Sequence, residues 1–390
     1  MAIYLDHAAS TPVRPEVIEH MGAVMSEQGA NPASAHQPGR HAGAVVAAAA
    51  AAVAALIGAA PEDIIWTSGA TEAINLALKG VLEFHGGGHV VSVASEHRAT
   101  LDTLSWLERR GVRVTRLGVD AAGRVDASAV AAAIEADTRC VSIMHVNNET
   151  GVVQDIAAIG AVCAEHCVAL HVDAAQSLGK LDLDVARMHI DLLSLSAHKM
   201  GGPQGAGALW LRPRIGLAAQ IHGGGQQGNR RSGTLAVAQV AGFGCACSLA
   251  QAEMAALPAQ LRALRQRLWQ ELAVIDGVLC NSPVQDSELG APHILNISVP
   301  GVHGAALLTG LLEGTPALAV SAGSACSAAR AESSHVLRAM GRTPAVAAAS
   351  LRFSLGRTTT KNDIELAAAR TRTEVARLRA LAPRQLAVPA

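Results

Sequence analysis

The sequence has almost no net charge and no paired-cysteine motif. Lysine and arginine number 31 against 32 for aspartate and glutamate, which leaves a formal charge of -1 at pH 7. This balance attracts neither nucleic acid nor an acidic membrane surface, although a small anion can still bind where donors cluster. The cysteines are odd in number and form no C-x-x-C pair, so we expect no disulfide framework, no structural zinc site and no intrinsic metal. They are Cys140, Cys163, Cys167, Cys245, Cys247, Cys280 and Cys326.

Strongly apolar segments long enough for a bilayer are also absent. The first residues show no basic start followed by an apolar core, so we expect no secretory signal. The longest apolar run, residues 42–60, is nearly all alanine and is broken by glycine, which makes it too weakly apolar to span a membrane. We interpret it as an alanine-rich helix and expect a soluble, cytoplasmic protein.

What the sequence does contain is an alternation of short apolar runs with longer helix-like stretches. Its 390 residues, half of them hydrophobic, are enough for two globular domains. The alternation predicts an α/β fold with a mainly parallel sheet covered on both faces, in which ligands bind beyond the carboxyl ends of the strands. We expect a large domain over residues 16–250 and a smaller α+β domain over residues 251–390, joined by the N-terminal segment 1–15.

Particular segments carry these expectations. The expected strands are residues 64–66, 89–94, 140–145, 168–172 and 191–196 in the large domain, and 294–299 and 351–354 in the small one. The expected helices include residues 72–84 and 100–109, and a connecting helix over 251–272. The candidate site residues come directly after these strands.

Small polar residues form the turn between the first expected strand and its helix. Residues 67–72 read TSGATE. The N–H groups of a helix's first turn have no partners within the helix, which favours a bound phosphate. An ordinary helix cap by Ser68 or Thr71 explains the same residues equally well.

Two polar residues follow the apolar run 168–172. Asp173 stands at the end of this strand, where a carboxylate can pair with a pyridinium nitrogen and keep it protonated, so that the ring withdraws electrons. Gln176 lies three residues further on, within reach of the phenolic oxygen of such a ring. Taken alone, Asp173 is equally consistent with a helix N-cap.

A lysine follows the next apolar run and precedes a glycine-rich turn. Residues 194–203 read SLSAHKMGGP, with Ser196 and His198 as donors beside Lys199. A lysine that forms a Schiff base needs a confined site that lowers its pKa, because the reaction requires a neutral amine. Most lysines are merely solvated, so Lys199 supports this interpretation only together with the other two motifs.

Taken together and in this order, the three motifs resemble fold type I pyridoxal-phosphate (PLP) enzymes, in particular the class V aminotransferases. The match is closest to the group I cysteine desulfurases, the branch that serves iron–sulfur assembly and nitrogenase maturation. It extends from residue 3 to about residue 370. The matching segments are residues 4–6, 8–9, 11–12, 67–72, 96–97, 147–149, 173, 176, 196–203, 231–234, 324–327 and 352–355. Residues 227–230 depart from the family pattern.

The resemblance implies pyridoxal 5'-phosphate as the cofactor, carried by Lys199. His97 would stack on the pyridine ring, Asp173 would keep its nitrogen protonated, and Asn148 and Gln176 would contact its edge and phenolic oxygen. The implied phosphate donors are Ala70, Thr71, Ser196 and His198, with Thr234 reaching the phosphate of the second subunit in a homodimer.

The resemblance also assigns the substrate carboxylate to Arg352, with Asn31 and Asn148 beside it. A guanidinium suits this role because it donates two parallel hydrogen bonds to a carboxylate. Without the resemblance, Arg352 reads as a salt-bridge partner, and Asn31, which precedes Pro32, reads as a turn residue.

Cys326 decides the reaction class. It lies in SAGSACSAA, residues 321–329, a run of small residues that is typical of a mobile loop and makes a poor core element. An ordinary buried cysteine is the alternative. The resemblance implies that the Cys326 thiolate attacks the sulfur of L-cysteine, which gives a Cys326 persulfide and alanine. Lys199 would move protons at the substrate, and His97 is a candidate acid–base group.

The resemblance further implies a protein that accepts the sulfur, such as an iron–sulfur scaffold whose nascent cluster the persulfide would meet. Two other functions stay open on the residues alone. One is a different PLP enzyme, such as a selenocysteine lyase or an aminotransferase, and an aminotransferase needs no thiol on a mobile loop. The other is a non-catalytic interaction partner, which needs neither Lys199 nor Asp173.

Overall fold

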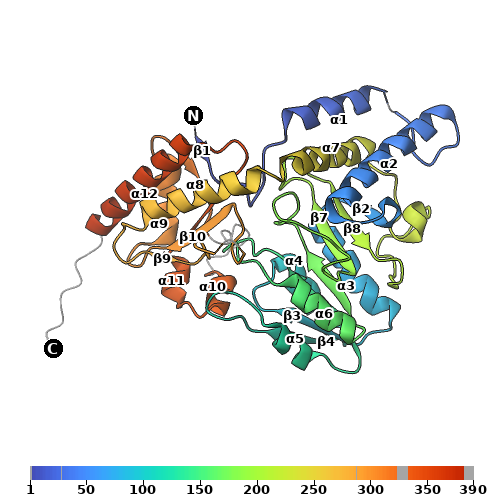
Figure 1. Ribbon diagram of the computed structural model, residues 1–390, viewed down its shortest axis with the longest axis horizontal. Helices are drawn as coiled ribbons and strands as arrows, with labels where there is room; N and C mark the ends of the chain where they lie inside the picture. Colours follow the sequence, from blue (N-terminus) through green and yellow to red (C-terminus); the bar gives the residue numbers. More distant parts are fainter. Residues whose placement is uncertain (1, 28, 287, 323–332, 382–390) are drawn as a thin grey trace. The chain divides into compact units, whose positions relative to one another are not determined.

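The computed structural model describes residues 2–27, 29–286, 288–322 and 333–381, and it divides them into two compact units (Figure 1). The large unit holds Ala8–Asn148 and Val152–Pro258. The small unit holds the residues up to His7, Glu149–Gly151 and the residues from Ala259 onward. The sequence predicts these boundaries between residues 15 and 16 and between residues 250 and 251.

The large unit is built on a seven-stranded sheet of order β2-β8-β7-β6-β5-β3-β4. The strands from β7 to β4 in this order run parallel, and β8 is antiparallel to both β7 and β2. The predicted α/β fold with a mainly parallel sheet is confirmed. The strands are β2 (Ile64–Thr67), β3 (His89–Val93), β4 (Arg113–Leu117), β5 (Thr138–Met144), β6 (Ala169–Asp173), β7 (Leu192–Ser196) and β8 (Gly207–Leu211).

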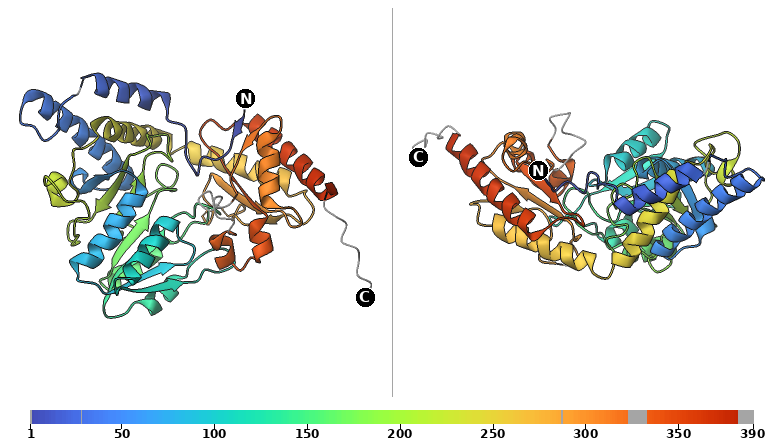
Figure 2. Two further views of the ribbon diagram at one scale, coloured as in Figure 1. Left: turned by 180° about the vertical axis from the view of Figure 1, so that it is seen from behind. Right: turned by 90° about the horizontal axis from the view of Figure 1, so that it is seen from above.

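Side chains alternate along these strands between two hydrophobic cores, because successive residues of a strand point to opposite faces. Ile64 and Trp66 belong to one core, whereas Ile65 belongs to the other. The first core is covered by α2 (Gln37–Ile57), α5 (Ala127–Ala133), α6 (Ile156–Glu165) and α7 (Val237–Glu253). The second core is covered by α3 (Ala70–Phe84) and α4 (Arg98–Glu108). Figure 1 and Figure 2 show this unit from opposite sides.

The alanine-rich run forms α2, as predicted. The expectation that this run is too weakly apolar to span a membrane is wrong by length and composition alone: α2 passes that test, and so do α7 and α8 (Leu257–Leu272) when they are taken as one bent span. In the large unit α2 packs along α7, which in turn contacts α1 (Pro15–Glu27) (Figure 1). Val53 and Ile57 of α2 are fully buried in the first core.

The small unit contains a three-stranded antiparallel sheet of order β12-β10-β9 and a parallel pair of β1 and β11. Its strands are β1 (Ile3–Tyr4), β9 (Leu279–Cys280), β10 (Ile294–Ser298), β11 (Leu318–Ala319) and β12 (Ser350–Ser354). Its helices are α8 (Leu257–Leu272), α9 (Gly304–Glu313), α10 (His335–Ala339), α11 (Pro344–Ala348) and α12 (Lys361–Leu381). The predicted α+β character and the predicted strands at 294–299 and 351–354 are confirmed.

One predicted element is wrong. The sequence predicts a single connecting helix over residues 251–272, whereas α7 ends at Glu253 and α8 begins at Leu257. Pro258 explains the break, because proline has no N–H group and disfavours a helical conformation at the residue before it. It is tolerated in the first turn of a helix, which is where α8 places it. The apolar pattern therefore continues through residues 254–256, where the helix is interrupted.

Candidate active site

Three neighbouring parallel strands end at one edge of the large sheet. The main-chain N–H of His145, after β5, donates to the carbonyl of Asp173 at the end of β6 over 2.9 Å. In the same way, the N–H of Ala174, after β6, donates to the carbonyl of Ser194 in β7 over 3.0 Å. The residues that follow β5, β6 and β7 therefore emerge side by side, which is where ligands bind in sheets of this kind.

The turn after β2 reaches the same edge through β8. Gly207 of β8 is paired with Thr67 on one side and with Ser196 on the other. A Cβ atom at Gly207 would lie only 2.4 Å from the Cα of Gly69, so a side chain here would push the turn away. Glycine at this position brings the start of α3, with Ala70 and Thr71, next to the end of β7.

Helix α3 begins without a side-chain cap. Its N-cap residue is Gly69, and the nearby main-chain N–H of Ser68 donates to Glu72 Oε2 over 2.8 Å. The helix-cap alternative for Ser68 or Thr71 is therefore not what the structure contains. The first-turn N–H groups, with no partners within the helix, make this end of α3 suited to an anion.

Ser196 supplies a further hydrogen-bond donor for a phosphate. Its Oγ is buried and has no hydrogen-bond partner within the described residues. An unpaired buried hydroxyl costs about 1–3 kcal/mol. A phosphate oxygen between Ser196 and the start of α3 would satisfy this donor, so the residues present fit the phosphate group of PLP.

Asp173 and Gln176 are both buried at the end of β6. Asp173 Oδ1 accepts a hydrogen bond of 2.9 Å from the N–H of Ala175, which fixes the carboxylate against its own turn. Gln176 Nε2 donates to the carbonyl of Ala8 over 2.8 Å. The carboxylate that is predicted to face a pyridinium nitrogen is thus held in one orientation at the strand end.

His97 is the N-cap of α4 and is half-buried. Its Nδ1 accepts a hydrogen bond of 3.1 Å from the N–H of Ala99, which leaves Nε2 as the nitrogen that carries the proton when the ring is neutral. Glu96, beside it, is fully buried and accepts from the N–H of Met144 over 2.6 Å. Burial, reinforced by the charge of Asp173, raises the pKa of Glu96 well above its usual range.

Lys199 is half-buried, and the protein binds its main-chain carbonyl from two sides. Lys180 Nζ donates to this carbonyl over 2.9 Å and Thr11 Oγ1 over 3.3 Å. His198 Nδ1 lies 3.2 Å from Ser10 Oγ. Burial first, and then the charges of Lys199 and Lys180, lower the pKa of His198 to about 4, so its ring is neutral at physiological pH.

Sequence reasoning assigned no role to Lys180 or to the segment that holds Ser10 and Thr11. Thr11 belongs to a stretch that carries the family resemblance, but the resemblance gave Thr11 no role at the site. Lys180 had no signal, because its contact with Lys199 joins two turns that are separate in the chain.

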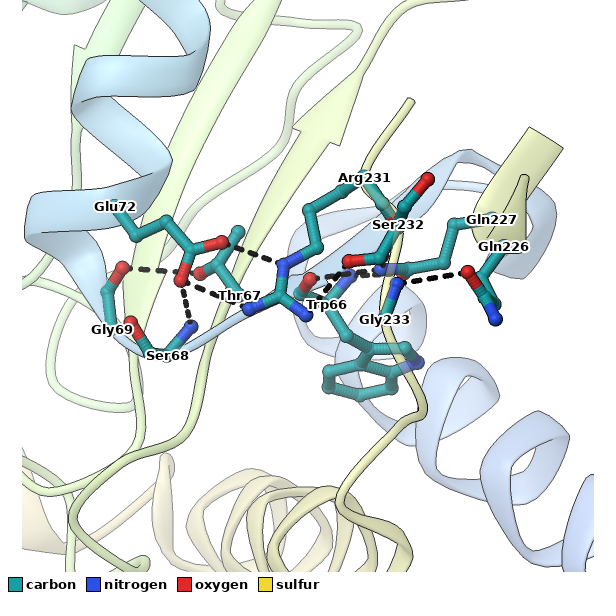
Figure 3. A network of polar contacts seen from close by, with 10 residues as sticks. All are labelled: Trp66, Thr67, Ser68, Gly69, Glu72, Gln226, Gln227, Arg231, Ser232 and Gly233. Carbon is teal, nitrogen blue, oxygen red and sulfur yellow. Dashed lines mark hydrogen bonds and ion pairs between the residues drawn. The ribbon is translucent and has the colours of Figure 1, made fainter. Parts of the chain in front are cut away.

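Residues 226–233 are tied to β2 and α3 by side chains (Figure 3). Gln227 Oε1 accepts from the N–H of Trp66 over 2.6 Å, and Gln227 Nε2 donates to the Trp66 carbonyl over 3.0 Å. Arg231 Nε donates to Glu72 Oε1 over 2.7 Å. Thr234, directly after this segment, is exposed.

The predicted substrate residues belong to different units. Asn31 is exposed in the large unit, and its Oδ1 accepts a hydrogen bond of 3.0 Å from the N–H of Ala33. This contact forms the turn that the neighbouring Pro32 indicates. Asn148 is the last residue of the large unit before the chain enters the small one. Arg352, in β12 of the small unit, is 2% exposed and donates from Nη2 to Asp6 Oδ1 over 2.8 Å. Cys326 lies outside the described residues.

Known proteins resemble this chain over nearly its whole length. Residues 3–366 match the family model described as aminotransferase class-V. The chain is 48% identical over 388 residues to a cysteine desulfurase IscS of Methylococcus capsulatus, which covers 98% of this chain and 94% of the relative. A solved structure called NifS-like protein has a TM-score of 0.90, is 31% identical and covers 97% of this chain and all of its own. Another, SspA in complex with cysteine, has a TM-score of 0.80, is 36% identical and covers 91% and 99%.

Proposed function

The chain belongs to the class-V aminotransferase family, and from this premise we propose how its residues carry out cysteine desulfuration. Its relatives match it over nearly their whole length and are cysteine desulfurases. The chain is therefore a PLP-dependent cysteine desulfurase with L-cysteine as its substrate. The observation that carries the proposal is the unpartnered Ser196 hydroxyl, buried beside the uncapped start of α3 at the edge that also holds Asp173 and Lys199.

When bound, PLP supplies an electron sink that stabilises negative charge at the substrate Cα. The phosphate would be held by Ser196, His198, Thr71 and the N–H groups at Ala70 and Thr71. Asp173 would hold a proton on the ring nitrogen, with His97, Asn148 and Gln176 at the ring. Lys199 would carry the cofactor and would move a proton at the substrate Cα.

His97 and His198 are suited to different tasks in this scheme. His198 is neutral at physiological pH, because its pKa is about 4, and it can donate a hydrogen bond without adding a charge. His97 has its Nδ1 occupied by Ala99, so proton exchange with the substrate would use Nε2.

Sulfur transfer would balance as follows. The Cys326 thiolate attacks the sulfur of L-cysteine, the new S–S bond forms, and the Cβ–S bond breaks. Its electron pair passes to the carbon fragment, which takes up a proton and leaves as alanine, while the sulfur remains on Cys326 as a persulfide. Arg352, with Asn31 and Asn148, would bind the substrate carboxylate during this step.

We also propose which partners this chain has and where it acts. We expect a homodimer in which Thr234 of each chain reaches the phosphate in the other, and an exposed Thr234 supports this. A protein acceptor of the persulfide sulfur, such as an iron–sulfur scaffold, and a cytoplasmic location complete the expectation. Analytical ultracentrifugation of the PLP-loaded protein tests the dimer, and a fully loaded monomer would contradict it.

Cys326→Ala tests the reaction itself. The variant should still bind PLP and L-cysteine, because those steps need only Lys199, Asp173 and the carboxylate site, but alanine formation should fall at least about a hundredfold since nothing attacks the substrate sulfur. After brief exposure to L-cysteine, mass spectrometry of the wild type should find one added sulfur on the Cys326 peptide.

Cys167→Ala is the matched control, because Cys167 is exposed and can take up sulfur without catalysis. It should keep wild-type alanine formation. Desulfuration by Cys326→Ala at the wild-type rate would instead favour a lyase or an aminotransferase, and persulfide on another cysteine would reassign the nucleophile.

A further inference from the structure

The turn after β6 carries a buried lysine to which the proposed mechanism gives no role. Lys180 is 8% exposed, and its Nζ donates to the main-chain carbonyl of Lys199. Gly179, just before it, has a left-handed conformation, and a Cβ there would lie 2.9 Å from the Cβ of Ala250 and 3.1 Å from the Cε of Met200. This tight packing fixes the main chain from which Lys180 extends.

Lys180 forms no ion pair with any residue that the structure describes. The titratable groups that face it are basic: Lys199, and His198, whose pKa both lysines lower. The hydroxyl of Thr11 donates to the same Lys199 carbonyl, and the side chain of Arg14 lies against Gly201. Arg14 is paired through two hydrogen bonds of 2.8 and 2.9 Å with Glu253 of α7.

We propose that Lys180 is a positioning residue for the cofactor-bearing lysine: it fixes the Lys199 carbonyl and holds a proton there, so that Lys199 keeps the neutral amine that attachment of PLP requires. This inference rests on the proposed role of Lys199.

The charge of Lys199 acts on the buried amine of Lys180, so the two amines bind protons as a coupled pair. Protonating both would place two positive charges together with little water around them, so the second proton binds weakly. Burial first, and then Lys199, lower the pKa of Lys180 to about 7. Burial works against a proton on Lys180, and the hydrogen bond to the Lys199 carbonyl at 2.9 Å, which is stronger for an ammonium than for a neutral amine, works for it.

A proton held on Lys180 therefore disfavours a second proton on Lys199. A neutral amine is the nucleophile that attacks a carbonyl group, and a neighbouring cation is one of the ways in which proteins keep a lysine neutral. The fold retains Lys180 although a buried ammonium without an acidic partner destabilises it, which fits a role at the site better than a role in stability.

Lys180→Met tests the inference, with Lys180→Arg as the variant that keeps the charge. Methionine has a similar volume and removes the buried charge, so the variant should fold and should melt no lower than the wild type. Lys361→Met, at an exposed position in α12, is the matched control. The apoproteins are mixed with PLP across pH values from about 6 to about 9, borohydride is added, and peptide mass spectrometry measures the label on Lys199.

In the wild type and in Lys361→Met, label on Lys199 should form readily at pH 7. In Lys180→Met the half-maximal pH should rise by about one unit, which means about tenfold slower labelling at pH 7, and Lys180→Arg should stay within about threefold of the wild type. The same pH midpoint in Lys180→Met and wild type would overturn the role of Lys180. Label that never appears on Lys199 in the wild type would overturn the proposed function instead, so the two failures are distinct.

Discussion

Several side chains that the resemblance assigns to the cofactor or substrate are already engaged by the protein itself. Asp173 accepts from the main chain of Ala175, Gln176 donates to Ala8, and Arg352 is paired with Asp6. Such contacts hold each side chain in one rotamer before a ligand arrives, so binding loses less conformational entropy. Ser196 differs, because its buried hydroxyl keeps its hydrogen-bonding capacity for a ligand.

Arg352→Ala should weaken L-cysteine binding strongly and leave PLP loading intact. The loss of a charge-assisted pair with a buried carboxylate costs on the order of 2–5 kcal/mol, which corresponds to at least about thirtyfold in affinity. Spectral titration of the PLP-loaded protein with L-cysteine measures this. Arg357→Ala, at an exposed position three residues after β12, is the control. An unchanged affinity in Arg352→Ala would exclude the carboxylate role.

At the scale of the elements, β2 is an edge strand, and the side chain of Gln227 takes the place that a further strand would have beside it. Gln227 offers both an acceptor and a donor to Trp66, as a neighbouring strand would. The residue falls in the stretch that departs from the family pattern. Together with the pair of Arg231 and Glu72, this contact anchors the segment that leads to Thr234 (Figure 3).

Gln227→Glu should loosen residues 226–233, because a carboxylate can accept from the N–H of Trp66 but cannot donate to its carbonyl. The loss of this half-buried hydrogen bond and the new oxygen–oxygen contact together cost about 1–3 kcal/mol of local stability. Hydrogen–deuterium exchange of this segment should therefore accelerate about fivefold or more. Gln251→Glu, exposed on α7, should leave the exchange unchanged. Equal protection in the wild type and Gln227→Glu would show that the amide is dispensable.

At the scale of the whole molecule, buried histidines make stability depend on pH. Burial lowers the pKa values of His145 and His171 to about 4, and His198 has a similar value. His171 lies between the hydroxyls of Ser142 and Ser194, each 2.9 Å from a ring nitrogen. The unfolded chain takes up protons as the pH falls through about 6.5, whereas the folded protein resists until about 4.

The free energy of unfolding should therefore decrease as the pH falls from about 6.5 to about 4. Each of these histidines contributes at most about 1.4 kcal/mol per pH unit. His171→Gln should flatten this dependence in thermal melts of the apoprotein, and His20→Gln, at an exposed position, should not. The raised pKa of Glu96 acts with the opposite sign, because its contribution is lost as the pH rises above about 4.5, so the melts are repeated with Glu96→Gln. A flat profile in that background would contradict the prediction.

The sequence by itself determined the α/β class, the main strands and the family. Parallel strands are buried on both faces and therefore read as continuous apolar runs, and a polar residue directly after such a run, like Asp173, lies at the ligand edge. These signals are local, so they are readable in a single chain. The connecting helix over residues 251–272 was wrong because periodicity outweighed the local signal of Pro258.

Only the tertiary structure decided which distant residues meet. Gly207 lets the start of α3 approach Ser196, Lys180 binds the carbonyl of Lys199, and Asp6 pairs with Arg352. Each of these contacts follows from the order of the strands or from a turn that crosses another segment. Strand order and such crossings produce no periodic pattern in the sequence. A motif can name a lysine and a serine at a site, but the sheet's order sets the distance between them, and the buried surroundings set their protonation.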